Sequence, residues 1–285
     1  MNGRDFVAER VKGVGSSGIR RAFDLAATLK DPIDLSIGQP DFAVPRNIKQ
    51  AVIDAVEADH NGYTQTRGLA QLRELISDQL KTEFRWEPDV FVTSGVSGGL
   101  FLALLACVNP GEEVLIGDPY FVSYVHLVRL VGGVPVLVDL YDDFQLHPER
   151  FEAAVTAKTK LIILSSPGNP TGIVYSENDV RSVAEIARRN DLLIISDEIY
   201  CVLTYDGRSP SPVPFAPERT LLLRGYSKTY AMTGLRIGYA AGPGEVITEM
   251  AKLQQYTFVC APHPAQYGAI EAATSDASGR TRWTG

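Results

Sequence analysis

Short apolar runs rich in β-branched and aliphatic residues recur along the middle of the chain, with helical or turn segments between them. The runs span residues 114–116, 134–138, 161–164, 192–195, 221–223 and 237–240. Between the third and fourth runs, Val180, Val183 and Ile186 recur at the spacing of one helix face. Strands that alternate with helices are typical of a mainly parallel sheet covered by helices on both faces. The sequence therefore predicts an α/β fold built around such a sheet.

Helical periodicity also marks the first part of the chain. Apolar residues follow helical spacing within residues 4–31, 47–58 and 69–80, and residues 33–37 alternate like a short strand. A turn rich in glycine and hydroxyl side chains, at 94–99, directly precedes the apolar run 100–108. Such a turn at a helix start presents free backbone N–H groups and is a candidate anion site. A plain glycine-rich turn is the alternative.

Composition argues against several classes of function. The chain has 285 residues and a net charge of −7, which argues against nucleic acid as a partner because no basic stripe is visible to neutralise phosphates. The run 100–108 is too short to cross a membrane, and the first ten residues show no secretory signal. Cys107, Cys201 and Cys260 lie far apart, as expected for unpaired thiols in the reducing cytoplasm. The four histidines show no metal-ligand spacing, and no metal site is expected.

Polar residues follow three of the predicted strands at the points where these strands end. The segments are 165–172, 196–200 and 227–228. In a parallel sheet, ligands bind beyond the carboxyl ends of the strands, so we expect the three segments to meet at one site. A desolvated lysine loses its proton more easily, and Lys228 would then form Schiff bases with aldehydes such as pyridoxal phosphate. Taken alone, Lys228 also fits a solvated surface charge.

Asp197 ends a strongly apolar run, so its carboxylate is expected to be partly buried and to need a cation or hydrogen-bond donors. A protonated pyridine nitrogen is such a cation, and Tyr200 and Asn169 can donate hydrogen bonds to a ring oxygen. Ser227 and Arg236 offer a hydroxyl and a bidentate cation to a phosphate. Each residue also has a simpler interpretation: a helix cap or salt bridge for Asp197, a core position for Tyr200 and turn formation for Asn169.

Three short motifs occur together in this chain: Ser-Lys-Thr-Tyr-Ala-Met-Thr-Gly-Leu-Arg at 227–236, Asp-Glu-Ile-Tyr at 197–200 and Asn-Pro-Thr-Gly at 169–172. Together they resemble the class I/II aminotransferases, which are fold-type I pyridoxal-phosphate enzymes, and the resemblance extends over residues 34–272. It implies that Lys228 carries the cofactor as a Schiff base and that Asp197 contacts the pyridine nitrogen. It also implies that Tyr200 and Asn169 contact the phenolic oxygen.

The resemblance implies roles for further residues. The phosphate cup would consist of Gly95, Val96, Ser97, Ser227 and Arg236. The aromatic ring stacked on the cofactor would be Phe121 rather than Tyr120. Gly38 would lie beside the substrate carboxylate, together with Asn169. Tyr63 resembles the tyrosine that reaches the phosphate of the partner subunit, which implies a homodimer with shared active sites.

Domain organisation follows from the same resemblance. Residues 1–45 would belong with a small domain, residues 46–273 would form the large pyridoxal-phosphate-binding domain, and residues 274–285 would be an irregular tail. Family members continue with a further small-domain segment, whose arginine clamps the substrate carboxylate. We therefore expect a C-terminally truncated chain with an incomplete small domain, in which Arg280 and Arg282 come too early for the clamp.

The predicted function is that of a pyridoxal-phosphate-dependent aminotransferase, which moves an amino group between an L-amino acid and a 2-oxo acid by a ping-pong Schiff-base mechanism. Lys228 would also act as the general base, and Asp197 would keep the cofactor ring protonated. Two alternatives stay open. One is a pyridoxal-phosphate lyase on the same fold, and the other is a non-catalytic cofactor-binding fragment without the clamp arginine.

Overall fold

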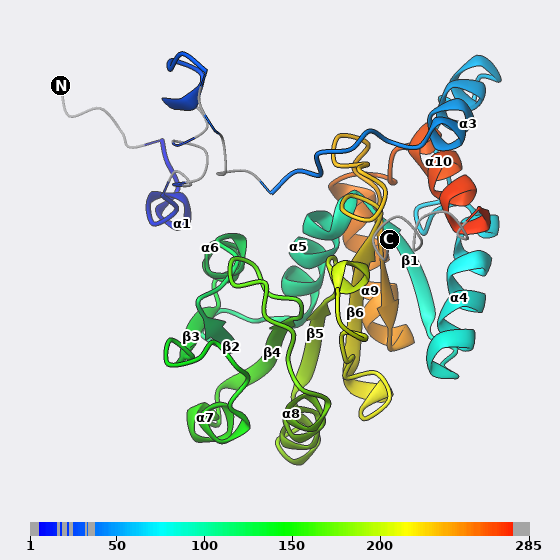
Figure 1. The fold of residues 1–285 in the computed structure, drawn as a ribbon. Helices are drawn as coiled ribbons and strands as arrows, with labels where there is room; N and C mark the ends of the chain where they lie inside the picture. The colour runs from blue at the N-terminus through cyan, green and yellow to red at the C-terminus, as the bar shows by residue number, and fades with distance from the viewer. Residues whose placement is uncertain are drawn as a thin grey trace.

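A mixed seven-stranded sheet forms the centre of the molecule (Figure 1). The computed structural model describes residues 6–15, 18, 22, 25–31, 33 and 38–275. The strands are β1 (Asp89–Thr93), β2 (Glu113–Asp118), β3 (Val134–Asp139), β4 (Thr159–Ser165), β5 (Leu193–Asp197), β6 (Thr220–Gly225) and β7 (Gly238–Gly242). Their order across the sheet is β1-β7-β6-β5-β4-β2-β3.

The predicted α/β fold with a mainly parallel sheet is confirmed. β3, β2, β4, β5 and β6 pair in parallel, whereas β7 pairs antiparallel with both β6 and β1. The six predicted strands correspond to β2 through β7, and β1 is an additional strand. The direction of β7 has a local cause. Residues 226–237, which join β6 to β7, contain no crossover helix, so the chain turns back on itself.

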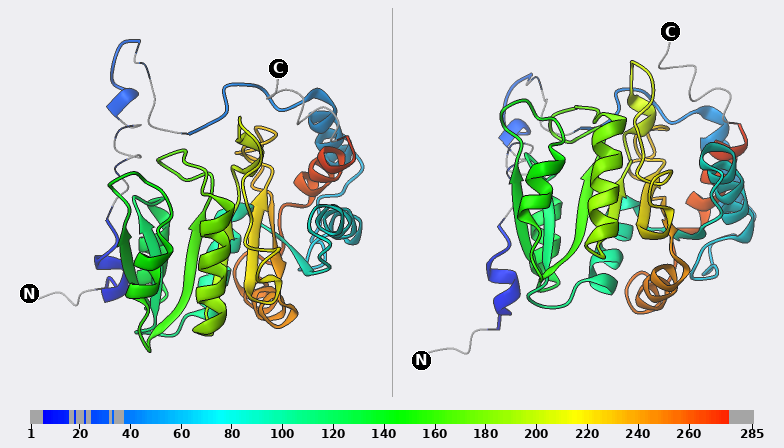
Figure 2. Two further views of the ribbon diagram at one scale, coloured as in Figure 1. Left: turned by 60° about the horizontal axis from the view of Figure 1, so that its bottom comes forward. Right: turned by 90° about the horizontal axis from the view of Figure 1, so that it is seen from below.

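Helices cover both faces of the sheet (Figure 2). They are α1 (Glu9–Lys12), α3 (Arg46–Glu57), α4 (Ala70–Phe84), α5 (Gly95–Cys107), α6 (Ser123–Leu130), α7 (Pro148–Ala154), α8 (Glu177–Arg189), α9 (Gly244–Tyr256) and α10 (His263–Thr274), with the short 3-10 helices η1 (Cys201–Leu203) and η2 (Pro217–Arg219). Leu161 and Ile163 of β4 are buried against α5 and α6, and Ile162 and Leu164 against α7 and α8. Burial on both faces explains why this strand is an unbroken apolar run.

A third apolar cluster joins α3, α4 and α10 to β1, β6 and β7. The helices predicted at 47–58 and 69–80 are α3 and α4, which place Ile48 and Leu72 in this cluster. Much of the predicted N-terminal helical region, the strand predicted at 33–37 beyond residue 33, and the tail after residue 275 lie outside the described residues.

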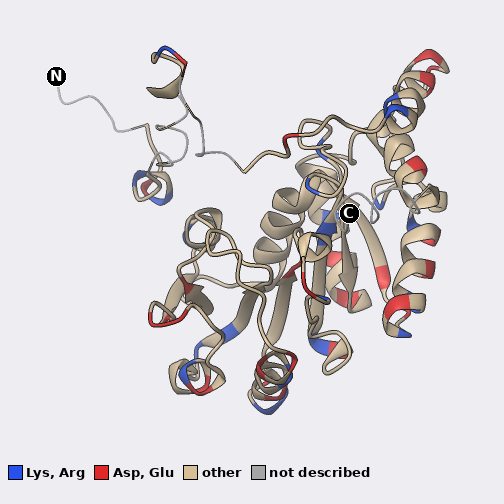
Figure 3. Cartoon of the chain, viewed as in Figure 1, with Lys and Arg blue, Asp and Glu red and all other residues tan. Residues whose placement is uncertain are grey.

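Charged residues of both signs are interspersed on the outer helices (Figure 3). Arg189 of α8, for example, donates to Glu152 of α7 at 2.7 Å. Exposed pairs of this kind contribute little to stability, on the order of 1 kcal/mol or less. Within the described ranges, no helix has both the length and the apolar character needed to span a membrane.

Candidate active site

Three neighbouring parallel strands, β4, β5 and β6, end at one edge of the sheet. Ser165 at the end of β4 pairs with Asp197 at the end of β5, and Asp197 pairs in turn with Leu223 of β6. The polar segments that follow these strands therefore leave the sheet side by side. This edge is the carboxyl end of the parallel strands, where α/β proteins bind ligands.

The Lys228 amine lies among residues from three separate segments. Its Nζ donates a hydrogen bond to the carbonyl oxygen of Gly38 and is 5.7 Å from the centre of the Tyr200 ring. Asn169 Nδ2 donates to Tyr200 Oη at 3.4 Å. Burial, together with the positive charge of Arg236, lowers the pKa of Lys228. A larger share of the amine is therefore neutral near neutral pH than for a solvated lysine.

The Asp197 carboxylate is buried, with 5% of the residue exposed. Tyr124 Oη donates to Asp197 Oδ2 at 2.8 Å, and the Ile199 N–H donates to Oδ1 at 3.3 Å. Among the residues that the structure describes, no cation forms an ion pair with Asp197. Burial raises the pKa of Asp197 to about 6, and the hydrogen bond from Tyr124 acts in the opposite direction. The site thus holds a buried carboxylate that two neutral donors stabilise only in part.

An anion cradle forms where α5 begins. The first backbone N–H groups of a helix have no intrahelical partner, and Val96 and Ser97 lie in this first turn, with Ser97 exposed. Gly95 has φ +72°, and a Cβ atom there would lie 2.5 Å from Nη2 of Arg236. The guanidinium therefore rests directly against the start of the helix. Helix dipole and guanidinium charge act together at this point, as anion binding requires.

The remaining predicted residues differ in their burial and in their contacts with the site residues described above. Ser227 is buried at the end of the β6 segment, next to Lys228. Phe121 packs edge-on against Tyr124, with ring centroids 5.6 Å apart, and so lies beside the side chain that contacts Asp197. Tyr120 is also partly buried in the same core, and the choice of Phe121 over Tyr120 stays a prediction. Tyr63 is 83% exposed, and in the described part of the chain no hydrogen bond connects it to the other site residues.

Sequence reasoning missed Tyr124. The residue stands in the first turn of α6, and both Tyr124 and Val128, one helical turn apart, are buried. A tyrosine on the buried face of a helix needs a partner for its hydroxyl, and this periodicity was the available signal. The partner itself could not be read from the sequence, because Asp197 is 73 positions away.

Sequence reasoning also missed a polar network behind the site. Glu198, which is 3% exposed, accepts from Arg224 Nη2 at 2.8 Å and from Ser196 Oγ at 2.9 Å. Arg224 Nη1 also donates to Glu83 of α4 at 2.7 Å. The network joins β5 and β6 to α4. Both of its carboxylates contact the Arg224 guanidinium, whereas Asp197 contacts no cation among the described residues.

The chain is similar to known proteins over most of its length. A sequence model of the family described as "Aminotransferase class I and II" matches residues 30–283. The "Putative aminotransferase YugH" of Bacillus subtilis is 44% identical over 274 residues, which cover 93% of this chain and 71% of that protein. The "Probable aspartate aminotransferase" of Methanocaldococcus jannaschii is 41% identical, over 93% of this chain and 72% of that protein. The solved structure of the aspartate aminotransferase from Thermus thermophilus with maleate superposes with a TM-score of 0.94 at 35% identity, covering 98% of this chain and 76% of that one.

Proposed function

Since the chain belongs to the class I and II aminotransferase family, whose members use pyridoxal 5′-phosphate, we propose that it moves an amino group between an L-amino acid and a 2-oxo acid by a ping-pong reaction. One observation carries the proposal. The buried Asp197 carboxylate, which has no cation partner among the described residues, shares a sheet edge with the Lys228 amine. A buried acid of this kind is suited to a ligand that brings its own positive charge.

The residues present fit this cofactor at three points. Asp197 offers an anion for a protonated ring nitrogen, and the start of α5 with Arg236 offers a cradle for a phosphate. Lys228 offers an amine of lowered pKa for an aldehyde. The first feature is costly without a ligand, because a buried carboxylate with no cation beside it is unfavourable.

The proposed contacts divide by the part of the cofactor they would hold. The phosphate would be bound by Gly95, Val96, Ser97, Ser227 and Arg236, the ring oxygen by Tyr200 and Asn169, and the ring face by Phe121. Asn169 Nδ2 already donates to Tyr200 Oη, so the two polar groups lie close enough to serve one acceptor. Gly38 and Asn169 would contact the substrate.

Bound pyridoxal phosphate supplies an aldehyde that condenses with amines and a ring that stabilises negative charge on the adjacent carbon. Lys228 would hold the cofactor and, once released, take the proton from the substrate α-carbon through its neutral Nζ. The Gly38 carbonyl accepts from this Nζ and thereby orients it. Asp197 would keep the ring nitrogen positively charged, and Tyr124 holds that carboxylate in place.

We further propose a cytoplasmic homodimer with shared active sites, in which residues 46–273 form the cofactor-binding domain. The 83% exposure of Tyr63 supports a role for this residue outside its own protomer. The three cysteines are free. Burial raises the pKa of Cys107 and Cys201 to about 11, so both thiols stay protonated and unreactive.

The proposal is tested by product analysis on the purified chain. Protein loaded with pyridoxal phosphate is incubated with a panel of L-amino acids and a 2-oxo acid, and both products are quantified. We expect one new 2-oxo acid for each new amino acid, without free ammonia. Release of ammonia would instead identify a lyase, and bound cofactor without turnover would identify a cofactor-binding protein.

A second measurement tests the attachment residue. Borohydride reduction of the loaded protein, followed by peptide mass analysis, should place the cofactor on Lys228. Lys228→Ala should lose the adduct and the visible absorbance. The matched control is Lys252→Ala, which removes an exposed lysine of α9 whose Nζ pairs with Glu249 at 2.6 Å. The control should keep both signals, and an adduct on any other lysine would refute the assignment.

A further inference from the structure

The loop between α3 and α4 carries Tyr63, and its backbone is fixed at several points. His263 Nδ1 lies 2.9 Å from the carbonyl oxygen of Gly62, and Gln254 Nε2 donates to the carbonyl oxygen of Thr66 at 2.7 Å. Gln266 accepts from the Leu69 N–H at 2.8 Å. The tethers therefore begin one residue before Tyr63 and continue to the start of α4.

Gln266 makes further contacts that connect this loop to a second one. Its Nε2 donates to Thr64 Oγ1 at 3.2 Å and to the carbonyl oxygen of Ala261 at 3.0 Å. Ala261 belongs to the loop that joins α9 to α10, and the backbone carbonyl of Gln254 accepts from the Val259 N–H in this loop at 2.7 Å. Two glutamines thus hold two loops against each other.

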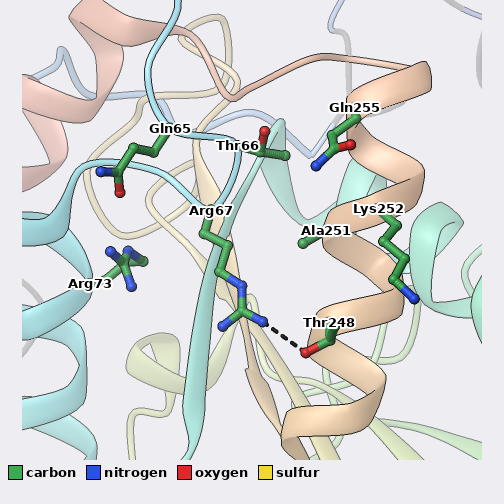
Figure 4. A pocket seen from close by; sticks show the side chains of 8 residues that line it. All are labelled: Gln65, Thr66, Arg67, Arg73, Thr248, Ala251, Lys252 and Gln255. Carbon is green, nitrogen blue, oxygen red and sulfur yellow. Dashed lines mark hydrogen bonds between the residues drawn. The ribbon is translucent and has the colours of Figure 1, made fainter.

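The far end of the Tyr63 loop is anchored as well. Figure 4 shows Arg67 reaching across to α9, where its Nη2 donates to Thr248 Oγ1 at 2.8 Å. Gly68 has φ +92°, and a Cβ atom there would lie 2.5 Å from Val92 of β1. The loop backbone therefore approaches the sheet more closely than a residue with a side chain would allow.

Burial of these two glutamines carries a cost that apolar side chains would avoid. Gln254 and Gln266 are both 0% exposed, and the Oε1 atom of Gln254 is buried without a hydrogen-bond partner. A buried amide is tolerated only when its hydrogen bonds are made, and an unpaired one lowers stability. Tyr63 itself is 83% exposed, so its side chain is not buried by the loop that the glutamines hold in place. The hydrogen-bonded loop backbone and the exposed side chain together indicate that Tyr63 contacts a group outside its own protomer.

We propose that Gln266, assisted by Gln254, is a positioning residue that holds the Tyr63 loop so that the Tyr63 hydroxyl meets the cofactor phosphate bound by a second copy of the chain. The inference rests on the proposed function, in which Tyr63 serves the partner's site. Beyond that function, the inference assigns Gln266 and Gln254 to holding the loop in place before the cofactor binds. Because the loop is already ordered, binding the phosphate costs little further conformational entropy.

The test compares affinities for pyridoxal phosphate and for pyridoxal, which lacks the phosphate. The 285-residue chain, Tyr63→Phe, Gln266→Leu and the double variant are titrated with both compounds. The quantity compared is the ratio of the affinity for pyridoxal phosphate to the affinity for pyridoxal. Tyr63→Phe should lower this ratio about tenfold, the effect of losing one hydrogen bond to a charged group. Gln266→Leu should lower it by a similar factor. The double variant should be no worse than Tyr63→Phe alone, because both changes act through the same hydroxyl.

Three results would overturn the inference. A wild-type ratio in Gln266→Leu refutes the positioning role while leaving the role of Tyr63 intact. Additive losses in the double variant show that Gln266 acts by another route. A wild-type ratio in Tyr63→Phe would show that the Tyr63 hydroxyl does not contact the phosphate, and the inference would then be wrong.

Two further variants separate positioning from general destabilisation. Gln79→Leu is the matched control, because it removes a glutamine-to-carbonyl bond between α4 and Ala273 of α10 without touching the loop. It should leave the ratio unchanged. If Gln266→Leu does not fold, Gln266→Glu replaces it, since it keeps the acceptor for Leu69 and loses both donors. The ratio should then fall again, and an unchanged ratio would count against the proposal.

Discussion

Asp197 and Glu198 are adjacent, acidic and both buried, yet they have opposite surroundings. Glu198 meets the Arg224 guanidinium and, through it, Glu83 of α4. Asp197 meets the Tyr124 hydroxyl of α6 and one backbone N–H. The two side chains point to opposite faces of the sheet. One carboxylate is therefore neutralised within the protein, while the other keeps its charge available for a ligand.

The difference separates an acid that is paired with a cation inside the protein from an acid that is not. A buried ion pair whose partners are all present is costly to break, and it leaves no unpaired charge for a substrate. A buried carboxylate without a cation is unfavourable in the free protein and strongly attracts a positive group. The contrast between these neighbours supports the proposed role of Asp197 more strongly than its burial alone does.

Replacement of each acid by its amide should give the largest effect. Asp197→Asn should lower turnover roughly a thousandfold, because an amide cannot hold a positive charge on the cofactor nitrogen. Glu198→Gln is the control at the neighbouring position and should lower the turnover of folded protein much less. The rates are measured under single-turnover conditions at saturating cofactor. Equal losses of turnover in the two variants would contradict the proposed difference in role between Asp197 and Glu198.

Removal of Arg224 should turn Glu198 into a second unneutralised acid. Arg224→Met should lower the free energy of unfolding by about 3 kcal/mol, the cost of leaving a buried charge without its partner. Denaturant titration of the cofactor-free protein measures this value. Arg188→Met, which breaks the exposed pair with Glu218, should cost less than about 1 kcal/mol. A similar cost for both variants would argue that the Glu198 pair is not structural.

The pH dependence of stability should reveal Asp197 directly. Burial raises its pKa from the ordinary 3.8 to about 6, so the folded protein binds this proton more tightly than the unfolded chain. The contribution to stability therefore grows as the pH falls through 6 and is complete below 3.8. Relative to Asp197→Asn, the cofactor-free protein should gain on the order of 1 kcal/mol between pH 7 and pH 5. A flat difference would mean that the carboxylate has its ordinary pKa.

Tyr124→Phe should produce the smallest change. The hydroxyl lowers the pKa of Asp197, so its loss should raise that pKa further and weaken cofactor binding about fivefold at neutral pH. The loss should be greater at pH 6 than at pH 8, because less of the carboxylate is then ionised. Cofactor titrations at both pH values measure this trend. Tyr175→Phe, on the opposite face of the sheet, should show no such trend.

The sheet, and the edge at which the three polar segments meet, were predictable because they depend on local patterns. Apolar runs such as 161–164 mark buried parallel strands, and polar residues after them mark the ligand edge. The motifs around Lys228 and Asp197 supplied the family. The strand β1 and the antiparallel direction of β7 were not predicted, because strand pairing depends on partners that are distant in sequence.

Side-chain partners were harder to foresee for the same reason. Nothing in Asp-Glu-Ile-Tyr distinguishes the acid that meets Arg224 from the acid that meets Tyr124. That difference arises only when α4 and α6 pack on opposite faces of the sheet. The buried glutamines were likewise invisible, because polar residues in a helix pattern are expected to face solvent.

The alternation of Asp197 and Glu198 has a consequence for how the chain tolerates change. Exchanging the two letters would leave charge, hydropathy and composition as they are, but would give each pocket an acid of the wrong length. A slip of β5 by one position would move one acid into the place of the other and bring Ser196 or Ile199 into the place left vacant. Two neighbouring side chains thus favour a single register of β5. A shifted register would disturb the Glu198–Arg224 ion pair and the proposed contact of Asp197 with the cofactor at the same time.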